Sequence, residues 1–115
     1  MRRAASISIG LAVLWIFVAF VRSGLTFHLA PILVAGTFPV VYAFDAEEPI
    51  SARGLVPPTV AGLAIALVAT LILAVAGEMT GPSLLPFGGA ATEAVVFSLA
   101  GAIGGFGIGM FRANR

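Results

Sequence analysis

The 115-residue chain contains no cysteine and no lysine, and its single histidine is His28. Without cysteine it has no disulfide, no thiol nucleophile and no thiolate ligand for zinc or an iron–sulfur cluster. One histidine cannot hold a haem between two imidazoles or build the usual zinc sites. We therefore expect neither a metal nor a cofactor.

Charge is scarce as well. Charged residues make up 10% of the chain, apolar residues make up 60%, and the net charge is +1. Ordinary soluble domains have about 25% charged and about 45–50% apolar residues, and small ones bury the smallest fraction of their surface. The composition excludes a disordered chain, and the low charge excludes a nucleic-acid-binding surface. The sequence predicts an integral membrane protein, and its expected partner is the lipid bilayer.

Four apolar stretches meet the length of about 20 residues that a membrane-spanning helix needs. They cover residues 4–21, 25–44, 55–77 and 92–111, and charged residues or helix breakers separate them. Pro57 and Pro58 fall in the first turn of the expected third span, where a missing amide donor has the smallest effect. The first stretch is longer than the apolar region of a signal peptide, so we expect an uncleaved span. The predicted fold is all-α: one membrane domain, residues 1–115, with four transmembrane helices in a small up-down bundle.

The arginines predict the orientation, because short cytoplasmic loops are enriched in arginine and lysine. If both termini are cytoplasmic, the outer side carries one arginine, Arg22, and the inner side carries the other five: Arg2, Arg3, Arg53, Arg112 and Arg115. The lack of lysine, with abundant alanine, glycine and valine, is typical of a GC-rich genome. We predict a multi-pass protein of a prokaryotic plasma membrane.

Small residues recur at four-residue spacing in two of the spans. Gly101, Gly105 and Gly109 form such a stripe in the fourth span, and the third span carries Gly62, Ala66, Thr70 and Ala74. Faces of this kind let helix backbones approach closely inside lipid. The stripes either pack within one bundle or join the chain to a second copy or to a partner membrane subunit, and the spacing does not separate the two interpretations.

Two further patterns are weaker. The outer connection at residues 78–91 reads EMTGPSLLPFGGAA, which is more apolar than a solvated loop, and it either lies in the interface or re-enters the membrane. The motif Pro31-x-x-Val34-Ala35-Gly36 is echoed by Pro57-x-x-Val60-Ala61-Gly62. Four matches among such common residues do not predict an internal duplication.

The candidate polar site lies at the outer ends of the spans. There, Arg22, His28, Glu78 and Glu93 are expected at similar depth. Glu93 suits the first turn of a helix, where the dipole favours a carboxylate and Thr92 is the expected cap. The neutral imidazole of His28 can likewise form a hydrogen bond with a neighbouring carbonyl or hydroxyl group. The alternative hypothesis is that Glu93 pairs with Arg22 or His28 in a cluster that senses pH or admits a small solute.

No set of residues has the spacing of a catalytic site, so we do not expect an enzyme. The size and the four spans are similar to those of the small multidrug resistance transporters. That family requires a glutamate within its first span, and residues 4–21 contain no acid. The sequence favours a structural or interaction role as a homo-oligomer or accessory subunit. The alternative is a small-solute transporter or channel that works as an oligomer.

Overall fold

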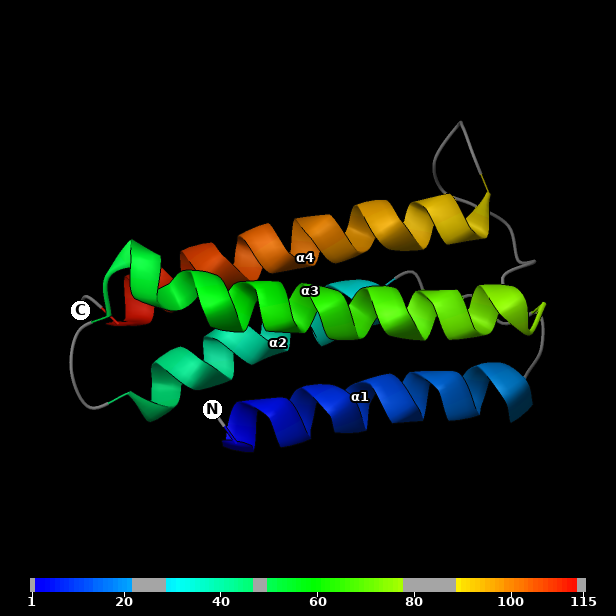
Figure 1. Cartoon of the computed structure of the whole chain (residues 1–115), viewed down its shortest axis with the longest axis horizontal. Helices are drawn as coiled ribbons and strands as arrows, with labels where there is room; N and C mark the ends of the chain where they lie inside the picture. Colours follow the sequence, from blue (N-terminus) through cyan, green and yellow to red (C-terminus); the bar gives the residue numbers. More distant parts are fainter. Residues whose placement is uncertain (1, 22–28, 47–49, 78–88, 114–115) are drawn as a thin grey trace.

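The computed structural model describes residues 2–21, 29–46, 50–77 and 89–113, which form four helices. They are α1 (Arg2–Val21), α2 (Ala30–Asp45), α3 (Ala52–Val75) and α4 (Ala90–Ala113). Successive helices run in opposite directions, so α1 is roughly parallel to α3 and α2 to α4 (Figure 1). The described part of the chain is all-helical, with the up-down order that the sequence predicts.

Three of the helices, α1, α3 and α4, are long and apolar enough to cross a membrane. The helix in the expected second span is shorter. It has 16 residues and begins at Ala30, not at residue 25, and at about 1.5 Å per residue it is about 24 Å long. Residues 25–28 lie outside the described part of the chain. The predicted boundary is therefore wrong at Leu29, which precedes the helix as its cap residue.

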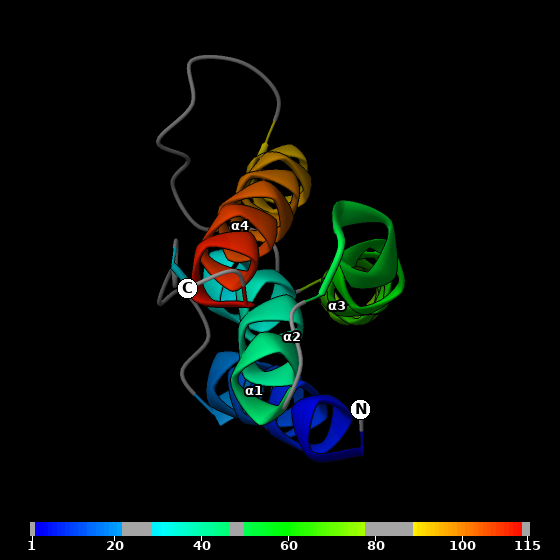
Figure 2. The same ribbon diagram turned by 90° about the vertical axis from the view of Figure 1, so that its left-hand side faces the viewer.

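The short helix α2 occupies the centre of the fold. It lies between α1 and α4, and α3 packs against one of its sides (Figure 2). Among the described residues α1 contacts α2 and α3 but not α4, so the four helices do not close into a square. The side of α2 that faces away from α3 has no described helix over it.

The start of α3 also differs from its prediction. The helix begins at Ala52, three residues before the expected boundary, because the Ser51 hydroxyl caps it by accepting a hydrogen bond from the Gly54 amide at 3.1 Å. Pro57 and Pro58 therefore lie inside the helix and beyond its first turn. Each removes one backbone hydrogen bond there. The Thr59 hydroxyl donates to the Leu55 carbonyl at 2.8 Å in the same turn.

Small side chains dominate the buried interior. The buried alanines include Ala12, Ala35, Ala66, Ala69 and Ala102, and the larger buried side chains include Trp15, Leu55 and Leu73. Lipid tails are as apolar as leucine, so burying large apolar side chains gives little gain inside a membrane and close backbone packing matters more. The interior has the composition expected of helices packed in lipid.

Candidate functional site: glycine contacts, the arginine end and Glu93

A very close helix contact joins α2 to α4 through glycines on both helices. A Cβ atom at Gly105 would lie 2.6 Å from the Gly36 carbonyl oxygen, and one at Gly101 would lie 2.5 Å from the Ile32 carbonyl oxygen. A Cβ at Gly36 would in turn lie 2.9 Å from the Gly101 oxygen. The two backbones therefore approach to a distance that excludes even an alanine side chain.

The contact continues toward the end of α4. A Cβ atom at Gly109 would lie 2.9 Å from Cδ2 of Leu55 and 3.3 Å from the Pro39 carbonyl oxygen. The stripe Gly101, Gly105 and Gly109 of α4 therefore packs against α2 and α3 of the same chain. Of the two interpretations of this stripe, packing within the bundle is the one that the described residues display.

The second small-residue face, on α3, packs against α2. A Cβ at Gly62 would lie 2.5 Å from the Ala35 carbonyl oxygen, which lacks its usual helical donor because residue 39 is proline. Ala66 and Thr70 are also buried. Ala74, the fourth residue of this stripe, is exposed, and in the last turn of α3 only Leu73 is buried.

Sequence reasoning missed Gly36, which is half of the contact between α2 and α4. A signal for it was present in the echoed motifs, because Gly36 and Gly62 close the two copies and both lie at close helix approaches. Ser8 was missed as well. Its hydroxyl is fully buried and donates to the Val34 carbonyl at 2.9 Å, which joins α1 to α2.

The described arginines gather at one end of the bundle, where α1 and α3 begin and α2 and α4 end (Figure 1). Arg3 forms an ion pair with Asp45 at 2.8 Å. The guanidinium carbon of Arg112 lies 4.9 Å from the centre of the Phe44 ring. Arg2 and Arg53 are exposed at the same end. An exposed ion pair such as Arg3–Asp45 contributes about 0–1 kcal/mol to the free energy of folding, so these charges stabilise the fold little. This end of the bundle is mainly a charged surface.

Glu93 lies near the opposite end of the bundle and is buried, with 3% of its surface exposed. It is in the first turn of α4, where the helix dipole favours a carboxylate. Because α4 begins at Ala90, Thr92 is inside the helix and is not its cap, contrary to expectation. Arg22, His28 and Glu78 lie outside the described residues, so the polar cluster remains a prediction.

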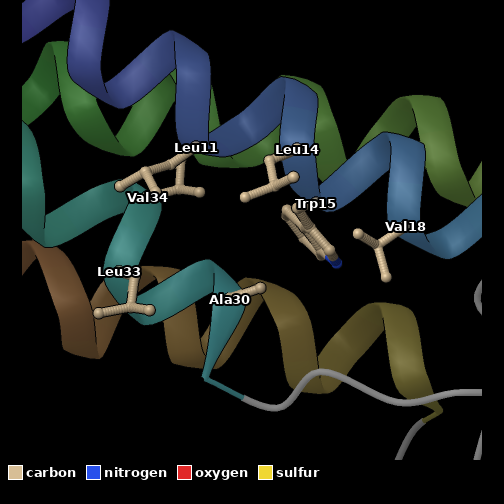
Figure 3. Close-up of a pocket in the computed structure, with 7 residues that line it drawn as sticks. All are labelled: Leu11, Leu14, Trp15, Val18, Ala30, Leu33 and Val34. Atoms are coloured by element: carbon tan, nitrogen blue, oxygen red, sulfur yellow. The ribbon is translucent and has the colours of Figure 1, made fainter.

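The surface between the helices carries shallow apolar grooves. One lies between α1 and α2, has a volume of about 150 Å³, and is lined by Trp15, Leu14 and Leu33 among others (Figure 3). A larger one, of about 290 Å³, lies between α2 and α4. In the described ranges no three metal-ligating side chains come together. The linings of the two grooves are almost entirely apolar, so they suit apolar occupants.

Comparison with known proteins gives no match: no family model matches the chain, and neither a curated protein nor a solved structure matches it.

Proposed function

We propose that the chain is a four-span protein of a prokaryotic plasma membrane, with both termini in the cytoplasm, that acts as a non-enzymatic, self-associating subunit of a membrane assembly. The arginine distribution supports the orientation. The apolar sequence of residues 25–44 supports α2 as a fourth span, although its described helix is short. A bilayer accommodates a short span by local thinning or oligomerisation.

The observation that carries the self-association is the position of Gly107. It lies inside α4 on an exposed surface, and a Cβ atom there would meet no atom of the described residues within 4 Å. A glycine inside a helix is about 1 kcal/mol less favourable than alanine, and here no contact with the described residues compensates for it. Ile103 and Phe111, four residues to either side, are each 72% exposed. The three residues form a hollow on one face of α4, which we call the outer α4 face, and its shape suits a helix of a second copy.

Replacing Gly107 by leucine tests this proposal. The added side chain fills the hollow of the outer α4 face, so we expect the oligomer to dissociate to monomer while the helical content is unchanged. Native mass spectrometry and crosslinking in mild detergent measure the oligomeric state, and circular dichroism measures the helical content. The matched control is Val60→Leu, on an exposed part of α3. A wild-type chain that is monomeric, or an oligomer that persists in Gly107→Leu, would contradict the proposal.

The second candidate, a small-solute transporter or channel that acts as an oligomer, rests on Glu93. An ionisable group buried in a membrane protein is a functional candidate in its own right. The grooves described above are apolar, however, and they form no polar path to the carboxylate. We therefore rank transport below the subunit role.

A further inference from the structure

The groove between α2 and α4 is a surface that the proposed function does not use. It opens on the side of α2 that faces away from α3, and no α3 residue lines it. Its walls include Leu33, Thr37 and Val40 of α2 and Ala100, Gly104 and Ile108 of α4. The Thr37 hydroxyl donates to the Leu33 carbonyl of its own helix, so it offers the groove no unsatisfied donor. An apolar chain is the occupant that suits these walls.

Gly104 produces the hollow. Unlike Gly105, whose missing side chain is required by the contact with Gly36, Gly104 has no atom of the described residues within 4 Å of the place where its Cβ would be. The close approach of α2 and α4 does not need a glycine at this position. A larger residue at position 104 would project into the groove and leave the helix contact beneath it in place.

A positive charge stands at one end of the groove. One helical turn beyond Val40 and Ile108 lie Phe44 and Arg112, with the guanidinium over the ring at 4.9 Å. Within the described ranges the one carboxylate at this end, Asp45, pairs with Arg3. From Ala100 to Arg112 the helix rises about 18 Å at about 1.5 Å per residue. The groove itself ends at Ile108, about 12 Å from Ala100, and one leaflet of the hydrocarbon core is about 15 Å deep, half of about 30 Å. An acyl chain in the groove therefore stays within one leaflet, with the guanidinium near the membrane surface.

We propose that this groove binds one anionic phospholipid of the leaflet at the arginine end, with an acyl chain along Gly104 and the phosphate on Arg112. Guanidinium groups bind phosphate through paired hydrogen bonds. A second copy of the chain is a poorer occupant. A two-fold symmetric dimer through this face would place the two Arg112 side chains at the same membrane surface and close together, where like charges repel.

Native mass spectrometry of the purified full-length chain tests the site. The chain is titrated with phosphatidylglycerol and, separately, with phosphatidylcholine of the same acyl chains. We expect the wild type to retain one phosphatidylglycerol in preference to phosphatidylcholine. Arg112→Gln should reduce that preference roughly fivefold, as expected for one arginine near an anionic headgroup. Gly104→Phe should weaken the binding of both lipids, because its ring occupies the acyl groove.

Two matched variants control for charge and bulk elsewhere. Arg53→Gln removes an exposed arginine from the same end, and Val60→Phe adds a ring to an exposed face of α3.

If Arg53→Gln and Arg112→Gln lose the preference for phosphatidylglycerol equally, the proposed site is wrong. The lipid would then be attracted by the positive charge of this end as a whole. A lipid-independent dimer that Gly104→Phe abolishes would assign the groove to a second copy. Arg112→Gln alters one exposed side chain, so its result stands even if Gly104→Phe fails to fold. The outcome is independent of Gly107→Leu, which tests a different face.

Discussion

Gly105→Leu should lose most of the packing between α2 and α4. Its Cβ alone would lie 2.6 Å from the carbonyl oxygen and 2.8 Å from the Cα of Gly36, and neither backbone atom can rotate away. Overpacking a buried site costs about 1–3 kcal/mol and occasionally more. Because the obstacle here is backbone, we expect a loss of at least about 3 kcal/mol in the free energy of unfolding. Titration with a denaturing detergent in mixed micelles, followed by circular dichroism, measures it.

The control for Gly105→Leu is the same substitution two residues away. At Gly107 a Cβ meets no atom of the described residues within 4 Å, and leucine is a better helix former than glycine by up to about 1 kcal/mol. Gly107→Leu should therefore leave the stability of the monomer unchanged or slightly higher. Equal losses in the two variants would mean that α4 does not pack on α2 through Gly105.

Leu55→Ala is the prediction with the second largest effect. Leu55 is fully buried near the arginine end, and a Cβ at Gly109 would lie 2.9 Å from its Cδ2 atom. Leucine-to-alanine changes in soluble cores cost about 2–5 kcal/mol through lost transfer free energy and the cavity left behind. In a membrane the unfolded reference still holds the leucine in lipid, so the transfer contribution largely cancels. We expect a loss of about 2 kcal/mol, the lower end of that range.

The same unfolding measurement on Val56→Ala gives the comparison for Leu55→Ala. Val56 is the next residue along α3, but it is 47% exposed, so its truncation should change the free energy of unfolding by less than about 0.5 kcal/mol. A loss in Val56→Ala as large as that in Leu55→Ala would show that this end of α3 is rotated away from the described orientation.

The helical class and the approximate positions of α1, α3 and α4 follow from the sequence because runs of apolar residues long enough to span lipid have few other uses. Helix ends were predicted less well. The predicted boundaries follow the charges, yet α1 includes Arg2 and Arg3. The prediction places Pro57 and Pro58 in the first turn of the third span, whereas α3 begins early enough for both prolines to lie beyond that turn. A capping serine at residue 51 determines the start of α3, and no periodicity in an all-apolar helix reveals it.

The small-residue stripes were visible in the sequence, but their partners were not. Spacing shows that Gly101 and Gly105 share a face, whereas only the arrangement of helices shows that the face meets Gly36. Ala74 continued its stripe by spacing alone and proved exposed. The groove above Gly104 was likewise invisible, because it is formed jointly by two helices that lie far apart in the chain.

The measurement that tests the four-span topology most directly is labelling of single cysteines in intact cells, since the natural chain has none to interfere. The positions are Val21, Ser51 and Gly89, which are exposed near the ends of α1, α3 and α4. We predict that a membrane-impermeant maleimide labels Val21→Cys and Gly89→Cys from outside, and that Ser51→Cys reacts only after the membrane is permeabilised. Labelling of Val21→Cys and Ser51→Cys from the same side would contradict the topology, because α2 would then not cross the bilayer.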